Sequence, residues 1–209
     1  ILVADGGSTD GSLTPDYLEA NRVTACLVKK SSGGLSTQMR MAFDYVLGKG
    51  YEGVVVIDGN GKDGFEAIPR FTELLDEGYD HVQGSRFIDG GVHRNTPLLR
   101  YLGVKFLHAP LVSLAAGFRY TDTTNGFRAY SRRLLTDPRV QPFREVFSKY
   151  ELHYYLAIRA ARLGMRVVEV PVARCYPDKG PTPTKISGLR GNFLILKTLF
   201  KAVTFRFDP

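Results

Sequence analysis

Two acidic, glycine-rich segments each follow an apolar run. Asp5 comes directly after the apolar residues 1–4, and Asp58 comes directly after the apolar residues 54–57. A carboxylate beside glycines can accept hydrogen bonds from a ribose or a base. The oxygen-bearing side chains of Asp58, Asn60 and Asp63 suit Mg²⁺ or Mn²⁺, which also takes ligands from substrate phosphates. The segments therefore indicate nucleotide binding and metal chemistry.

Both segments also have a purely structural explanation. Residues 5–12 fit a turn between a strand and a helix, with Asp10 or Ser12 capping the helix. Residues 58–63 fit a Gly/Asn turn after a strand. The first segment lacks the glycine spacing of a dinucleotide fold or a P-loop, and the second lacks the ligand pattern of an EF-hand.

Apolar runs alternate with helix-period segments along the chain, which predicts an α/β fold. The expected strands are residues 1–4, 23–28, 53–57, 81–83, 126–130 and 166–172, and the expected helices are 15–21, 36–47, 69–77, 97–116, 150–163 and 189–205. The runs that precede Asp5 and Asp58 are continuously apolar, as in inner strands of a parallel sheet. We therefore expect neighbouring inner strands whose ends bring Asp5 and Asp58 together at a crevice.

Composition places the chain among folded proteins. It has 209 residues, 44% of them hydrophobic and 23% charged, which suits one domain. The formal net charge of +7 favours an anionic partner. The longest stretch without Asp, Glu, Lys or Arg, residues 106–118, is shorter than the ~20 residues that span a bilayer, so we expect no transmembrane helix. Only two cysteines and no signal peptide pattern indicate a cytoplasmic protein.

The order of the motifs resembles the family 2 glycosyltransferases, in the branch that contains dolichol-phosphate mannose synthase and bacterial polysaccharide transferases. The resemblance runs to about residue 185 and rests on the segments at 3–11, 54–61, 66–69, 84–87, 125–130 and 169–172. It implies a GT-A fold: a Rossmann-like, mostly parallel central sheet flanked by helices. The family has a further strand before the one at residues 1–4, so we expect that strand to be missing here and to precede residue 1.

The resemblance also implies a donor site. Asp5 would contact the nucleoside, while Asp58 and Asn60 would take the first and last places of the family's metal-binding DxD motif. Because the last carboxylate is here the amide of Asn60, we expect weaker metal binding, supplemented by Asp63. Arg86 and Lys185 would bind the nucleotide sugar's phosphates; solvated surface cations are the alternative for Lys185.

Acceptor residues follow from the same resemblance. Arg100 would hold an acceptor phosphate, although an arginine that covers a core helix explains the position as well. Glu151 would be the general base for a hydroxyl acceptor, because residues two apart on a helix point in different directions and His153 cannot share its face. Asp122 would orient the acceptor, with a turn-forming Asp as the alternative.

The expected function is inverting transfer of a sugar from a nucleotide-diphosphate sugar to a lipid-phosphate or glycan acceptor, with no nucleic-acid partner. We expect a catalytic domain at 1–188 and an amphipathic C-terminal helix at 189–209. Its aromatic and basic residues suit the inner face of a membrane, and core packing explains them equally well. The alternatives are a sugar-phosphate nucleotidylyltransferase, whose basic phosphate loop is not found at 5–12, and a lipid- or polyanion-binding module.

Overall fold

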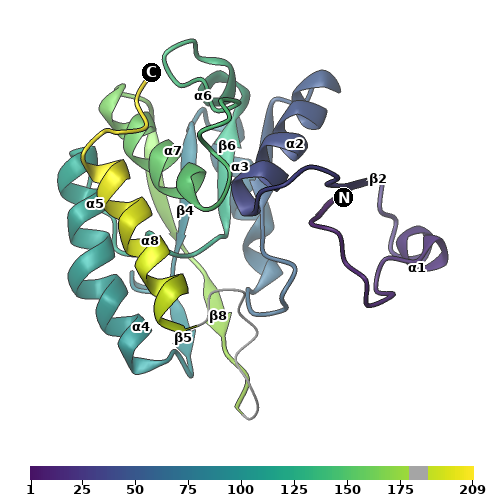
Figure 1. The fold of residues 1–209 in the computed structure, drawn as a ribbon, viewed down its shortest axis with the longest axis horizontal. Coiled ribbons are helices and arrows are strands. Elements are labelled where there is room, and N and C mark those ends of the chain that lie inside the picture. The colour runs from purple at the N-terminus through teal and green to yellow at the C-terminus, as the bar shows by residue number, and fades with distance from the viewer. Residues whose placement is uncertain (179–187) are drawn as a thin grey trace.

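The computed structural model describes residues 1–178 and 188–209, and it has the expected α/β fold (Figure 1). Its largest sheet has four strands in the order β3-β6-β4-β7. These strands are β3 (Gly53–Val56), β6 (Arg128–Ser131), β4 (His81–Ser85) and β7 (Val167–Pro171). β6 runs antiparallel to both of its neighbours, and only the β4–β7 pair is parallel. The sheet is therefore mixed, where a mostly parallel one was expected.

The first two strands form a separate parallel pair, β1 (Leu2–Asp5) with β2 (Ala25–Val28). Within the described residues, β1 pairs only with β2, and β3 pairs only with β6. The expectation that the strands before Asp5 and Asp58 are neighbours in one sheet is therefore wrong. A run of apolar residues indicates that a strand packs against other residues, but it does not indicate which strand lies next to it.

Helix α2 (Leu35–Gly48) connects the two sheets by packing against both β1 and β3. The side-chain Nε2 of Gln38 donates a hydrogen bond of 3.0 Å to the carbonyl of Ala4. Figure 1 shows β2 and α1 (Pro15–Ala20) at one side of the molecule, with α2 between them and the main body. The N-terminal pair of strands is thus held to the body through a helix.

The main hydrophobic core lies between α2, β6 and the C-terminal helices. It includes Phe43, Tyr130, Leu152, Leu156 and Leu199. The helices that supply it are α5 (Ala109–Ala116), α6 (Arg132–Thr136), α7 (Glu151–Arg162) and α8 (Gly188–Val203). A second core on the other side of the sheet is covered by α3 (Ile68–Asp76), which follows a short 3₁₀ turn (Phe65–Ala67).

The helix expected over 97–116 is one continuous helical segment. It contains α4 (Leu98–Gly103), a π-helical turn (Val104–His108) and α5. Pro110, near the start of α5, has no N–H to donate to the preceding turn, which accounts for the wider turn just before it.

The segment Leu98–Ala116 is 19 residues long and apolar enough to cross a membrane by length and composition. The length argument behind the expectation of no transmembrane helix therefore does not hold for this segment. It counted only charge-free residues, whereas this segment contains Arg100 and Lys105.

Candidate active site

The acidic loop after β3 is fastened to the short strand β8 (Ala173–Cys175), which pairs in parallel with β5 (Val92–Arg94). The N–H of Gly64 donates to the carbonyl of Ala173 at 3.0 Å, and the N–H of Cys175 donates to the carbonyl of Lys62 at 2.8 Å. The loop is therefore an ordered part of the molecule. It places Asp58, Asn60 and Asp63 beside β8.

Arg174 on β8 lies between the two carboxylates of this loop. Its Nη1 donates to both oxygens of Asp63, at 2.7 and 2.6 Å, and its Nη2 donates to Oδ2 of Asp58 at 3.1 Å. The side chain of Asp63 is fully buried, while that of Asp58 is 29% exposed. Burial would lower the pKa of Arg174, but the charges of Asp63 and Asp58 raise it, so this guanidinium is permanently charged.

Asn60 faces the same carboxylate. Its Nδ2 donates to Oδ2 of Asp58 at 3.3 Å, and its Oδ1 accepts a 3.3 Å hydrogen bond from the N–H of Lys62. The side chains of Asp58 and Asn60 thus contact one another, with the amide nitrogen of Asn60 facing the carboxylate and its Oδ1 facing the N–H of Lys62. Asp63 is already paired with Arg174, so its expected role as a metal ligand stays a prediction that requires this pair to open.

The motif Asn125-Gly126, just before β6, lies against Asp58. A Cβ atom on Gly126 would lie 2.7 Å from Oδ1 of Asp58, closer than real Cβ contacts allow. Oδ1 of Asn125 accepts hydrogen bonds from Nη1 of Arg174 at 3.3 Å and from the N–H of Phe127 at 3.1 Å. The glycine in this motif is therefore required for the observed position of Asp58.

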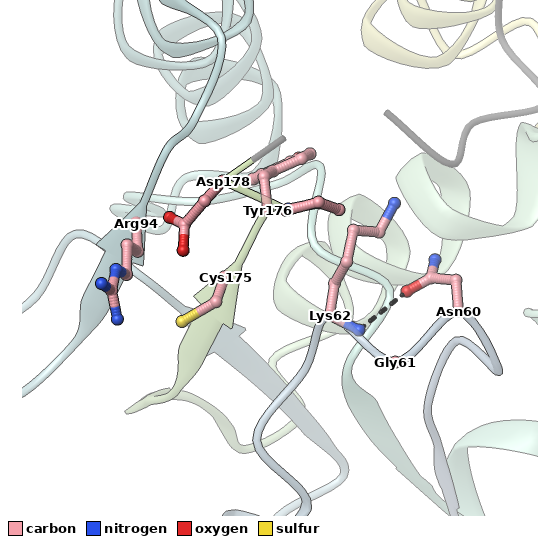
Figure 2. A pocket seen from close by; sticks show the side chains of 8 residues that line it. Asn60, Gly61, Lys62, Arg94, Cys175, Tyr176 and Asp178 are labelled. Atoms are coloured by element: carbon pink, nitrogen blue, oxygen red, sulfur yellow. Dashed lines mark hydrogen bonds between the residues drawn. The ribbon is translucent and has the colours of Figure 1, made fainter. Parts of the chain in front are cut away.

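A pocket of about 260 Å³ opens beside this loop (Figure 2). Lys62 and Asn60 lie on one side of it, and Arg94, Cys175 and Asp178 lie on the other. One carboxylate, Asp178, and the cations Lys62 and Arg94 line its wall, and the two cations suit a phosphate.

Tyr176, on the pocket wall, lies among several cations. The ammonium of Lys62 lies 5.3 Å from the centroid of its ring, and Nη1 of Arg100 donates to its hydroxyl at 3.0 Å. Burial alone would raise the pKa of Tyr176. The hydrogen bond and charge of Arg100, with the charges of Arg86 and Arg174, outweigh that effect and lower it. The structure therefore places Arg100, expected on the acceptor side, next to the pocket.

Arg86 and Asp122 form a buried ion pair with each other. Nε of Arg86 donates to Oδ2 of Asp122 at 2.5 Å, and its Nη2 donates to Oδ1 at 2.9 Å. The side chains are 1% and 0% exposed. Glu169 holds the neighbouring turn by accepting hydrogen bonds from the N–H groups of Thr121 and Asp122. The expected contacts of Arg86 with the donor and of Asp122 with the acceptor stay predictions.

Asp5 is held within its own loop. Its Oδ2 accepts hydrogen bonds from the N–H groups of Gly7 and Ser8, both at 2.8 Å, and its Oδ1 accepts one from the hydroxyl of Ser8 at 2.6 Å. The Ser8 hydroxyl bond is the largest cause of the lowered pKa of Asp5. No hydrogen bond or ion pair joins Asp5 to Asp58 among residues 1–178 and 188–209. Nucleoside contact by Asp5 stays a prediction.

Glu151 stands at the first position of α7, where its Oε2 accepts hydrogen bonds from the N–H groups of Ser148 and Lys149, at 2.9 and 2.5 Å. These bonds secure the entry to the helix, a structural task apart from general-base catalysis. His153 is half-buried with its Nε2 out of contact with water, and this desolvation keeps its pKa well below the ordinary value. Lys185 lies outside the described residues.

Sequence reasoning missed Arg174 and Tyr176. Along β7 and β8 the inward positions alternate, and Val170, Val172, Arg174 and Tyr176 are all buried. A cation at an inward position of a period-two pattern needs a buried anion, and that signal was present in the sequence.

The donor atoms fit a metal that takes few protein ligands. Within the described part of the chain, no group of three or more His, Cys, Asp or Glu side chains could hold a metal ion by itself. Asp58 and Asn60 carry the carboxylate and amide oxygens that Mg²⁺ or Mn²⁺ uses when phosphates and water complete the shell, provided that the amide of Asn60 turns its Oδ1 from the N–H of Lys62 toward the ion.

Comparison with known proteins places this geometry in a family. No protein-family profile matches the chain. The chain is 32% identical over 195 residues to polyprenol monophosphomannose synthase of Mycolicibacterium smegmatis, covering 91% of the chain and 72% of the relative. It is 31% identical over 193 residues to undecaprenyl-phosphate mannosyltransferase of Micrococcus luteus, covering 90% and 76%.

Solved structures agree on the fold. Glucosyl-3-phosphoglycerate synthase of Mycobacterium tuberculosis, in complex with Mn²⁺, uridine diphosphate and phosphoglyceric acid, matches with a TM-score of 0.65 and 18% identity. The match covers 97% of this chain and 66% of that chain, just under two thirds of its length. Together with the two relatives above 30% identity, this shows that the chain belongs to the family 2 glycosyltransferases and has their GT-A fold.

Proposed function

We propose that the protein transfers a sugar from a nucleoside-diphosphate sugar to a polyprenyl phosphate, with inversion at the anomeric carbon. One observation carries this choice of acceptor: Arg100 and Lys62 flank Tyr176 beside the acidic loop, so cations for a second phosphate lie next to the donor site. The relatives named for polyprenol-phosphate and undecaprenyl-phosphate substrates support the same acceptor class.

On the donor side, the bond between the anomeric carbon and the diphosphate breaks, and the diphosphate leaves with the electron pair. A divalent cation held by Asp58 and Asn60 would supply positive charge to this leaving group. Lys62 lies on the same loop and adds charge from the protein itself. Burial and the charge of Arg174 lower the pKa of Lys62. We place the nucleoside against Asp5, and Arg86 and Lys185 remain donor residues in this proposal.

On the acceptor side, a phosphate oxygen forms the new bond to the anomeric carbon. A phosphate is anionic at neutral pH and is already a nucleophile, so no general base is needed. The hydrogen bonds that Oε2 of Glu151 accepts at the entry to α7 support a mechanism without a general base. Arg100 would orient the phosphate through its guanidinium, and Asp122 would support the site through its buried partner Arg86.

The transfer assay compares acceptors. The protein is incubated with radiolabelled nucleotide sugars, Mn²⁺ and either a polyprenyl phosphate or a free alcohol of the same chain length. We expect labelled lipid only with the phosphate, and a loss of at least about tenfold in Arg100→Gln. Arg139→Gln, on a distant exposed ion pair, serves as the matched control. Equal labelling of the alcohol would contradict a phosphate acceptor.

We further propose that the protein works at a membrane surface on the cytoplasmic side, with one face of its helices in the lipid headgroup region. Exposed apolar side chains gather on Leu98–Ala116 and on α8, which packs against α5. They include Leu98, Leu99, Phe106, Leu114, Phe193 and Phe200. Lys105, Lys197 and Lys201 are exposed on the same helices and suit anionic lipids.

The inner side of these helices packs against the rest of the protein. Leu199 and Ala202 of α8 are buried in the main core, together with Phe207. Core packing and an exposed apolar face therefore coexist on α8, which favours a helix that lies in the plane of the membrane surface. A division between a domain at 1–188 and a helix at 189–209 remains our proposal.

Sedimentation with phosphatidylglycerol vesicles tests this surface. Leu99 is 86% exposed, and Leu99→Asp should reduce the bound fraction several-fold because it places a charge in the lipid-facing surface. Tyr17→Asp on α1, also an exposed position, should leave binding unchanged. Equal loss in both variants, or no loss in either, would remove this surface from the proposal.

A further inference from the structure

Arg174 occupies a position where it competes with a metal ion. Its guanidinium contacts both Asp58, whose side chain is partly exposed, and Asp63, whose side chain is fully buried. The side chain of Arg174 is only 7% exposed, so water screens the charge of its guanidinium little. The charge of Asp58 is therefore already partly balanced without any bound ion.

The surroundings of Arg174 leave it few alternatives. Its Nη1 divides its hydrogen bonds between Asp63 and Oδ1 of Asn125. The Nδ2 of Asn125 is buried and has no hydrogen-bond partner among the described residues. An oxygen acceptor brought by a ligand would satisfy this donor, and the donor belongs to the residue whose Oδ1 contacts Arg174.

We propose that Arg174 is a positioning residue that makes metal binding conditional on the donor's diphosphate. This role rests on the proposed function: Arg174 holds Asp58 while no donor is bound. A cation next to Asp58 repels Mn²⁺ or Mg²⁺ and takes one of its ligand oxygens. A bound diphosphate would place negative charge beside both Arg174 and Asp58, and its oxygens would supply the further ligands that a metal at Asp58 and Asn60 needs.

The test measures Mn²⁺ alone, with no nucleotide, sugar or acceptor. Free Mn²⁺ is followed by electron paramagnetic resonance in titrations of the protein and of Arg174→Gln. We expect weak binding by the unaltered protein and binding at least about tenfold tighter in Arg174→Gln, because the variant releases Asp58. Mn²⁺ should also raise the melting temperature of Arg174→Gln and leave that of the unaltered protein nearly constant.

Arg94→Gln is the matched control, because Arg94 lines the same pocket and no ion pair to Asp58 or Asp63 is found for it in the described residues. If Arg94→Gln tightens Mn²⁺ binding as much as Arg174→Gln, the effect is one of general charge and the proposal fails. A folded Arg174→Gln that binds Mn²⁺ no more tightly than the unaltered protein also overturns it.

A second variant covers the case in which Arg174→Gln does not fold. Combining Arg174→Gln with Asp63→Asn removes the buried ion pair as a unit and leaves no uncompensated buried charge. Asp58 again loses its cation, so this variant should bind Mn²⁺ more tightly, and unchanged affinity would overturn the proposal. Because no sugar transfer is measured, these results are independent of the acceptor assay.

Discussion

Replacing Asp122 by Asn tests whether the buried ion pair is as important to the fold as its geometry indicates. The substitution keeps the shape of the side chain and removes the negative charge that faces Arg86 across hydrogen bonds of 2.5 and 2.9 Å. Since both side chains are at most 1% exposed, no water replaces the lost partner. Breaking a buried pair from one side costs about 3–5 kcal/mol. For a domain of this size that is about 6–20 °C in melting temperature.

Thermal and urea unfolding of the two proteins measure this loss. Asp137→Asn is the control, because Asp137 pairs with Arg139, whose side chain is 58% exposed, and such pairs contribute about 1 kcal/mol or less. The combination of Asp122→Leu with Arg86→Met should recover most of the stability, since apolar groups of similar volume replace buried ion pairs well. A loss of stability in Asp122→Asn no larger than that in Asp137→Asn would show that the buried pair does not stabilise the fold. Sugar transfer measured on the stable double variant would then show whether Arg86 and Asp122 serve the fold alone or catalysis as well.

Three further predictions concern the site and the core. Gly126→Ala should weaken donor binding by about tenfold or more in calorimetry, because its Cβ would displace Asp58, whereas Gly103→Ala has open space and should have no effect. Glu151→Gln should keep transfer to a polyprenyl phosphate within about tenfold; a loss of 10²–10⁴ would indicate general-base catalysis. Burial lowers the pKa of His81 from 6.5 to about 3, so its contribution to stability is fully present above pH 6.5 and is lost as the pH falls toward 3. Urea unfolding at pH 7 and pH 5 should show that the free energy of unfolding falls by up to about 1.4 kcal/mol per pH unit because of this group, and that it falls less in His81→Phe. An equal fall in the two proteins would contradict this prediction.

Much of the fold could be predicted from local patterns. The helix expected from residue 15 begins at Pro15, and Gly78 and Gly164, with positive φ, follow the ends of α3 and α7, near the expected ends of those helices. The pairing of strands could not be predicted, because hydrophobic runs carry no information on neighbours. β5 and β8 were missed for a related reason: each has three residues, and their partners are distant in sequence.

The candidate site was predicted in part. Asn60 of the acidic loop lines the pocket, and Arg100 contacts Tyr176 on the pocket wall, so the two predicted segments lie near one another; their roles stay predictions. What motif order could not show is that Arg86 and Asp122 pair with each other, or that Asp63 pairs with Arg174. Such pairs depend on which side chains become buried together, and only the packed structure determines that.

Calorimetric titration with nucleoside diphosphates in the presence of Mn²⁺ tests most directly whether Asp58 takes part in binding the diphosphate of an activated sugar. We predict that uridine or guanosine diphosphate binds, that the triphosphate gains nothing, and that Asp58→Asn weakens binding by at least about tenfold. Preference for a triphosphate, or diphosphate binding that Asp58→Asn leaves unchanged, would contradict the account.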